Sequence, residues 1–368
     1  MAGENQVMNP IGISRLGAVN VTGADKDALF LKVFSGEVLQ VFEENNALLP
    51  LVRQRTISSG KSAQFPVTGV ATAKYHTPGE SIMASGTDTT SPADGVLDAS
   101  KYLTNMSHTE RVISIDGMLV SSAFIGDIDE AKNHYDVRSA YSTQIGRELA
   151  YHADKALIRT CIAGARKTAD RFGGSDAKFL GDQVALDTDS PADGVQGDEI
   201  VTGLFTVAQK MDEASVPTDG RYCVLSPANY YKLVNTANDS VLRAINRDFG
   251  NEGNGSIARG EIVQVAGLRI LKSNHIPSAN ESSTQDAVLG DDLINNDVFT
   301  SDGGYSGANF TTTEGICFQT EGLGTVKLLD LAMESEYQLD RLGTLMVAKY
   351  AMGHGILREE CLFELTTA

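Results

Sequence analysis

The feature that most constrains the fold of this chain is one long helical pattern that begins at Asp127. Asp127 and Glu130 form a start signal resembling a capping box, and Gly164 is the expected stop. A helix over 127–163 would be about 55 Å long, more than the roughly 30 Å width of a small domain. We therefore predict a spine helix that spans the molecule. Its apolar face consists of Ile128, Ala131, Tyr135, Tyr141, Ile145, Leu149, Ala153 and Leu157.

Residues 53–116 are predicted to form one long two-stranded arm. Segments typical of strands stand at its two ends, and residues 79–100 between them are small, acidic and polar, as expected of a loop tip. A hairpin alone buries too little apolar surface to be stable, so the arm must lie against something else. Before it, residues 1–23 are aperiodic, and residues 25–43 predict an amphipathic helix.

After a polar linker, the pattern predicts an inserted α/β unit. A helix is expected to end before Pro217, and residues 222–225 are expected to form a buried strand. Ser226-Pro227 places an N-cap and an N1 proline at the start of a further helix. Two short strands are expected on either side of Gly267.

The end of the chain is rich in predicted strands. Residues 278–313 are polar and are expected to form a long loop outside the core. Strands follow at 325–329, 345–348 and 362–365, and we expect them to pair with the strand near 110–116. That pairing would make one domain discontinuous and gives an α+β fold class.

Charge and cysteine content narrow the classes of function. The net charge is −18 and the isoelectric point is about 4.7, which disfavours a nucleic-acid-binding protein, because such proteins neutralise phosphates with Lys and Arg. The cysteines form no CxxC pair and the histidines have no i, i+4 spacing, so we predict buried free thiols, no metal site and no cofactor. No signal peptide or membrane span is expected. The cysteines are Cys161, Cys223, Cys317 and Cys361.

Motifs that could carry chemistry are incomplete, so we predict that the chain is not an enzyme. Ser59-Gly60-Lys61-Ser62 ends like a phosphate-binding loop, but Arg55 stands where that loop needs a glycine. The glycine-rich stretches 250–260 and 303–307 do not connect a strand to a helix. Gly353-His354-Gly355 has no paired nucleophile and is expected to be a turn between strands.

Several ordered strings resemble the major capsid proteins of T-seven-like short-tailed (podovirus-type) double-stranded-DNA bacteriophages. The resemblance covers 24–165 and 315–363 well and 196–277 loosely. Its most specific strings are Ala28–Phe34, Arg55–Val67, Asp129–Ser139, Gly324–Ala332 and Ala348–Gly355.

The resemblance implies the Hong Kong 97 phage-capsid fold and a structural viral protein. Such a subunit self-assembles into an icosahedral shell of hexamers and pentamers around double-stranded DNA, which is held without sequence-specific binding. The implied partners are a scaffolding protein and a portal, and the implied location is the virion capsid, assembled in the host bacterial cytoplasm. The implied parts are an N-terminal arm (1–52), an extended E-loop (53–116), a peripheral domain (117–195 and 316–368) with the spine helix, and an axial domain (196–315).

Assembly contacts are predicted on two of these parts. On the E-loop we expect Arg55, Ser59, Lys61 and Phe65 to contact a neighbouring subunit. On the spine helix the candidate residues are Asp127, Tyr135 and Arg138. The alternative function is an encapsulin-like bacterial compartment shell, which shares the fold but encloses cargo enzymes.

Overall fold

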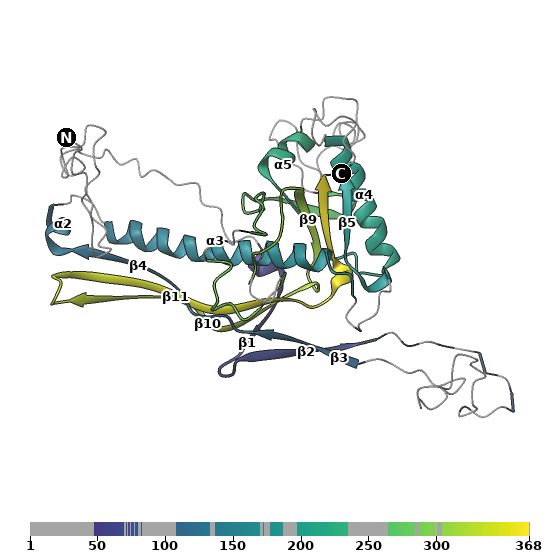
Figure 1. Cartoon of the computed structure of the whole chain (residues 1–368), viewed down its shortest axis with the longest axis horizontal. Coiled ribbons are helices and arrows are strands. Elements are labelled where there is room, and N and C mark those ends of the chain that lie inside the picture. Colours follow the sequence, from purple (N-terminus) through teal and green to yellow (C-terminus); the bar gives the residue numbers. More distant parts are fainter. Residues whose placement is uncertain are drawn as a thin grey trace.

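Figure 1 shows the computed structural model of the chain, in which a compact body carries a long spine on one side, with a two-stranded arm below it. The predicted helix 25–43 and most of the loop tip 79–100 lie outside the described residues. The structure describes residues 48–69, 108–132, 137–169, 177–186, 197–234, 264–283, 288–296 and 304–367, together with positions 71, 73, 75, 76, 78, 79, 82, 172, 286, 298 and 299.

A four-stranded sheet runs along the spine. Helix α3 (Val137–Ala165) lies along this sheet (Figure 1), and the short helix α2 (Asp127–Lys132) precedes it. The sheet order is β1-β10-β11-β4, in which β1 and β10 are parallel and the other neighbours are antiparallel. The strands are β1 (Arg53–Thr56), β4 (Leu119–Gly126), β10 (Leu323–Gln338) and β11 (Gly343–Ile356).

A six-stranded sheet forms the compact body. Its order is β5-β12-β9-β6-β8-β7, and helices α4 (Gly197–Glu213) and α5 (Pro227–Val234) pack in the same core. The sheet crosses the limits of the predicted axial domain, 196–315, because β5 and β12 lie outside them. The strands are β5 (Asp182–Leu186), β6 (Arg221–Leu225), β7 (Gln264–Val265), β8 (Leu268–Lys272), β9 (Thr313–Gln319) and β12 (Leu362–Thr367).

The structure confirms the elements predicted for the inserted unit. Helix α4 ends at Glu213, before Pro217, and β6 is largely buried. The hydroxyl of Ser226 accepts a hydrogen bond from the backbone N–H of Asn229 at 3.3 Å, as expected of an N-cap. Ala266 and Gly267 form the tight turn between β7 and β8, and both have positive φ.

The arm is shorter than the predicted range 53–116. Strands β2 (Ser62–Thr68) and β3 (His108–Ser114) form an antiparallel pair, but β1 belongs to the four-stranded sheet, where it pairs with β10. The turn around Gly60, which has a φ of +116°, redirects the chain from β1 into β2. The prediction therefore placed Arg53–Thr56 in the wrong sheet.

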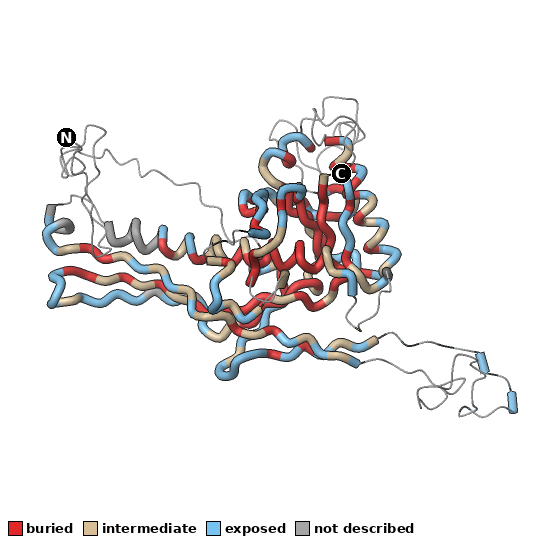
Figure 2. Tube along the Cα trace, in the orientation of Figure 1, coloured by how far each residue is buried: buried red, intermediate tan, exposed pale blue. Residues whose placement is uncertain are grey.

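The C-terminal part of the spine helix is fully buried. Figure 2 shows buried residues concentrated there and exposed residues towards the other end of the spine. Ile158, Cys161 and Ile162 are each 0% exposed. We predicted that Gly164 ends the helix. It lies instead within the last turn, which finishes at Ala165. A Cβ at Gly164 would lie 2.2 Å from Cδ1 of Leu362, so glycine is needed there for close packing against β12.

The segment 278–313 is not the surface loop that its polarity suggested. Leu289, Tyr305 and Phe310 are buried, and Phe310 is 0% exposed. Arg159 of the spine helix forms an ion pair with Glu281 at 2.6 Å. The prediction was wrong because the apolar residues of this segment are few and widely spaced, and their partners lie on α3.

Two predictions about the returning strands also require correction. Strand β11 pairs with β4 and β10, and the strand near 110–116 pairs with β2. Gly353-His354-Gly355 is not a turn but lies inside β11. A Cβ at Gly353 would lie 1.9 Å from the backbone oxygen of Ser114, and one at Gly355 would lie 2.8 Å from Ile113. Both glycines are therefore required where β3 crosses β11.

Candidate assembly surface

The arm formed by β2 and β3 has one buried face and one exposed face. Successive side chains of a strand point to opposite faces, and β2 alternates accordingly: Ala63 and Phe65 are buried, while Gln64 is exposed. The buried face packs against Val326 of β10, Ala351 of β11 and Leu357, which directly follows β11. In Figure 1 the arm lies below the body. Its exposed face is available to another molecule.

The structure separates the four predicted E-loop residues into two groups. Ser59 and Lys61 are exposed in the turn between β1 and β2, and Arg55 is exposed near the end of β1. Phe65 is only 7% exposed and packs in its own subunit. It is therefore not presented to a neighbour, contrary to our prediction. The Arg55 guanidinium lies 5.7 Å from the centre of the Phe65 ring and donates a hydrogen bond to the backbone oxygen of Gln64 at 2.7 Å. These contacts hold Arg55 in place while leaving it exposed.

A buried carboxylate attaches the arm to the body. Glu359, whose side chain is 0% exposed, forms ion pairs with Arg111 of β3 and, at 3.4 Å, with Lys167. A carboxylate removed from water requires such partners, because its desolvation is costly. The Arg111–Glu359 pair therefore fixes β3 against the segment that follows β11.

The far end of the spine exposes several apolar side chains. Asp127 lies there and accepts a hydrogen bond from the Tyr337 hydroxyl at 2.6 Å, which ties α2 to β10. Tyr135 and the side chain of Arg138 lie outside the described residues. Clustered exposed apolar residues are typical of interaction surfaces, and this end carries Ile128 (65% exposed), Tyr337 (47%), Leu339 (79%) and Leu342 (62%).

The described residues offer little for catalysis. Ser62 of the Gly-Lys-Ser sequence begins strand β2, so this turn leads into a strand and not into the helix that a phosphate-binding loop requires. Burial raises the pKa of the Cys161 and Cys317 thiols, so these thiols are not activated nucleophiles. Within the described residues no group of His, Cys, Asp or Glu is arranged to hold a metal ion. None of the described helices is long and apolar enough to span a membrane.

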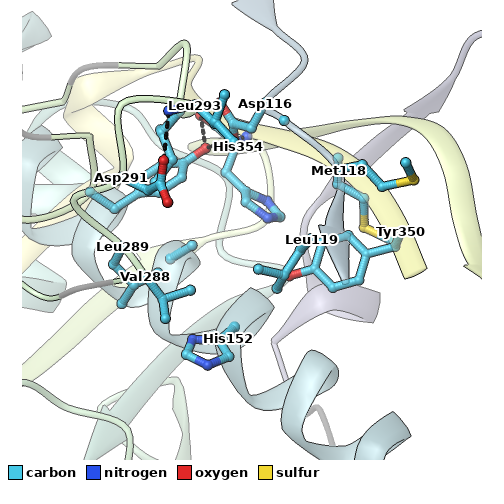
Figure 3. A pocket seen from close by; sticks show the side chains of 15 residues that line it. Asp116, Met118, Leu119, His152, Val288, Leu289, Asp291, Leu293, Tyr350 and His354 are labelled. Carbon is cyan, nitrogen blue, oxygen red and sulfur yellow. Dashed lines mark hydrogen bonds between the residues drawn. The ribbon is translucent and has the colours of Figure 1, made fainter. Parts of the chain in front are cut away.

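A pocket of about 210 Å³ lies at the root of the arm, between α3, β11 and the segment 288–305. Figure 3 shows Asp116 and His354 at one end of it and His152 at the other. The Asp116 carboxylate accepts hydrogen bonds from the Tyr305 hydroxyl at 2.7 Å and from the side chain of Asn296 at 2.9 Å. Burial raises the pKa of Asp116 from 3.8 to about 6.

Sequence reasoning did not identify the residues that hold the arm to the body. Asp116, Asn296, Tyr305 and Glu359 are single polar residues without a spacing pattern. The one available signal concerned Phe65: its alternation with Gln64 and Ala63 already indicated that it shares the buried face of β2.

Comparison with known proteins identifies relatives along nearly the whole chain. A sequence model described as "Gp10A-like: Major capsid protein" matches residues 64–366. The chain is 32% identical to the major capsid protein of Escherichia phage T7 over 352 residues, which covers 92% of each chain. It is also 32% identical to the major capsid protein of Enterobacteria phage T3, covering 92% of this chain and 91% of that one.

Solved structures show the same similarity in three dimensions. A chain from the capsid structure of the Cyanophage P-SCSP1u is 39% identical, with a TM-score of 0.69, and the match covers 96% of this chain and 98% of that one. A chain of the bacteriophage PhiM1 mature capsid is 17% identical, with a TM-score of 0.64 over 97% of both chains. At that identity the second match shows the fold alone, which is the Hong Kong 97 phage-capsid fold.

Proposed function

This chain belongs to the Gp10A-like family of major capsid proteins, and from that premise we propose how its exposed surfaces build a shell. It is a structural protein of the phage virion and forms the icosahedral capsid. The similarity to phage capsid proteins along more than nine-tenths of the chain overturns the encapsulin-like alternative. The finer assignments concern the contacts, the partners and the site of assembly.

The arm provides the main contact with a neighbouring subunit. The observation that carries this assignment is that the arm has one face packed on its own subunit and an opposite face that is exposed. Arg55 in β1, and Ser59 and Lys61 in the turn that leads from β1 into the arm, are exposed beside it. Each contact can be weak, because a subunit in a closed shell is held by several neighbours at once. Hexamers and pentamers are the units that such contacts build.

Replacing Arg55 and Lys61 together with alanine is expected to lower the association constant of each contact about tenfold, which is roughly 1.4 kcal/mol, and thereby to reduce the yield of closed shells. Both residues are exposed, so the folded subunit should keep its stability. The yield can be measured by sucrose-gradient sedimentation and electron microscopy.

The control for this experiment is the charge-conserving double variant Arg55→Lys with Lys61→Arg, which should assemble better than the alanine variant. Normal shells from the alanine variant, at the wild-type yield, would contradict the contact role. A loss of subunit stability in urea would show instead that Arg55 acts through its position over Phe65.

The partners follow from the family and from charge. We assign a scaffolding protein and a portal as assembly partners, and packaged double-stranded DNA as the content of the shell. A net charge of −18 suits a wall that must not adhere to the DNA beside it. We assign no catalytic role, and we place assembly in the cytoplasm of the bacterial host.

Electron microscopy of the full chain, expressed with and without the scaffolding protein encoded by the same phage, tests this function. Uniform closed shells are expected with the scaffolding protein, and irregular shells, tubes or rings without it. Single subunits under both conditions, at high protein concentration, would contradict the assembly role.

A further inference from the structure

We propose that Leu293, Asn295, Asn296 and Tyr305 form a releasable latch that fixes the direction of the arm, and that Asp116 is the residue on which this latch closes. The proposal concerns the subunit before assembly, and it holds whichever arm residues contact a neighbour. Four observations carry it: the open edge of β11, the hydrogen bonds to residues 114–117, the burial of Asp116 and the adjoining pocket.

The first observation is that β11 has an edge that β4 does not cover. Strand β4 pairs with β11 only as far as Tyr350, although β11 continues to Ile356. Backbone groups left without a partner there would destabilise the fold. The backbone N–H of Asp116 donates to the oxygen of Met352 at 3.2 Å, and the Tyr305 hydroxyl accepts from the N–H of His354 at 2.9 Å. The root of the arm and the latch therefore complete this edge together.

The second observation is that the latch binds both sides of the chain where the arm leaves the body. Asn296 accepts from the N–H of Ser114 at 3.0 Å and donates to the oxygen of the same residue at 2.7 Å. Asn295 donates its side-chain N–H to the oxygen of Ile115 at 2.7 Å. Such paired contacts restrain the orientation of a strand as well as its position, because two bonds fix its rotation.

Glycine 117 extends the same contact by one residue. Its N–H donates to the backbone oxygen of Leu293 at 2.8 Å. A Cβ at this position would lie 2.8 Å from Cβ of Leu293 and 3.2 Å from its oxygen. An alanine at Gly117 would therefore displace the latch without removing any polar group.

The third observation is that Asp116 is partly buried and accepts hydrogen bonds from the latch. It accepts from Tyr305 at 2.7 Å, from the N–H of Asn295 at 2.9 Å and from the side chain of Asn296 at 2.9 Å. Burial nevertheless dominates these bonds and raises the pKa of Asp116 from 3.8 to about 6. The closed latch thus shields this carboxylate partly from water, and opening it would hydrate the carboxylate further.

The direction of the pH effect follows from this difference. An open latch would return the pKa of Asp116 towards 3.8, so the closed latch binds a proton more tightly. Lowering the pH through about 6 must then favour the closed latch, and raising it must favour release. The change in the ratio of closed to open forms can reach about 100-fold, at tenfold per pKa unit.

Other titratable groups also face this site. Asp291 and Tyr305 lie on the latch side, Tyr350 and His354 on β11, and His152 on α3, and all five line the same pocket as Asp116. Burial lowers the pKa of His354 to about 4 and lowers that of His152. The two histidines affect folding with the opposite sign to Asp116. Because their pKa values are lowered in the folded subunit, its stability falls as the pH drops below the usual histidine pKa. The position of the arm, not global stability, must therefore be measured.

The fourth observation is the pocket of about 210 Å³ that Asp116 adjoins. Side chains at the wall of a cavity have fewer packing partners on that side. The latch residues can consequently move away from Asp116 without displacing the core of α3.

Distance measurements between two spin labels test the proposal in the full-length, unassembled subunit. One label is attached at Thr68→Cys on the arm and one at Glu213→Cys at the end of α4, both exposed sites. The native cysteines do not compete for the label, because all four are 0% exposed. A single narrow distance distribution is expected from the otherwise unsubstituted chain.

Gly117→Ala and Asn296→Ala should each broaden this distribution or add a second distance at about pH 7.5. Asn280→Ala is the matched control, because the side chain of Asn280 contacts Ser282 within its own loop. In Gly117→Ala, lowering the pH to about 5 should restore the narrow distribution, since protonation favours the closed latch. Adding Asp116→Asn to Gly117→Ala should abolish that response, and adding His152→Gln should leave it.

Two results would overturn the proposal. A narrow distribution in both Gly117→Ala and Asn296→Ala would show that the latch does not set the direction of the arm. A pH response that persists with Asp116→Asn would show that another group couples the latch to protonation.

Discussion

Replacing Gly353 with alanine is expected to lower the free energy of unfolding of the subunit by about 3 kcal/mol or more. The new Cβ would lie 1.9 Å from the backbone oxygen of Ser114 and 3.0 Å from the side chain of Asn296. Neither can move cheaply, because Asn296 binds the N–H and the oxygen of Ser114 at the same time. Urea denaturation of the unassembled subunit measures the change.

Gly267→Ala is the control for this substitution. Nothing lies within 4 Å of a Cβ at Gly267, although its φ of +81° disfavours alanine. We expect a loss of about 1–2 kcal/mol there, from backbone strain alone. Equal losses for the two variants would contradict the close crossing of β3 and β11. Gly353→Ala should also free the root of the arm, since Ser114 must shift to admit the Cβ.

The predictions from sequence succeeded where the interaction that creates an element lies within that element. The start of α5 depends on Ser226 and the N–H of Asn229, three residues later. The turn between β7 and β8 depends on Gly267 and its immediate neighbour. Such signals can be read from a few consecutive residues, because the partners are consecutive.

The predictions failed where the partner lies far along the chain. Gly353 suggested a turn, but the reason for a glycine there is the close approach of Ser114, which belongs to another strand. The polar segment 278–313 concealed Phe310, which is covered by Arg159 of α3 and by Arg166 directly after it, with guanidinium-to-ring distances of 5.6 and 5.4 Å. Composition within a segment cannot reveal which distant side chains will cover it.

The candidate assembly surface was predictable only where its features depend on neighbouring residues. The exposed turn with Arg55 and Lys61 follows from strand alternation and the glycine between them. The attachments at Asp116 and Glu359 do not, because each depends on ion pairs or hydrogen bonds with residues from other elements. Family resemblance supplied the shell-building function, which no local pattern encodes.

Replacing Glu364 with glutamine is expected to cost about 3 kcal/mol or more of stability, because it removes one partner of a buried ion pair. The Glu364 side chain is 0% exposed and accepts two parallel hydrogen bonds from Arg166, at 2.6 and 2.7 Å. Thr313 and Gln183 donate two more, at 2.6 and 2.8 Å. One carboxylate thus joins the end of α3 to strands β5, β9 and β12. An amide group fits the same space but presents N–H donors where four donors already point.

Glu321→Gln provides a matched control, since Glu321 pairs with Arg358 at the same N···O distance of 2.6 Å but its side chain is 45% exposed. An exposed ion pair contributes about 1 kcal/mol or less, so the control should stay within that limit. Urea denaturation of the unassembled subunit compares the two variants, and equal losses would contradict the role of burial. If Glu364→Gln alone lowers the stability, the joint between the spine helix and the six-stranded sheet depends on this carboxylate. The variant should then form fewer shells even though its arm and its exposed contact residues are unchanged.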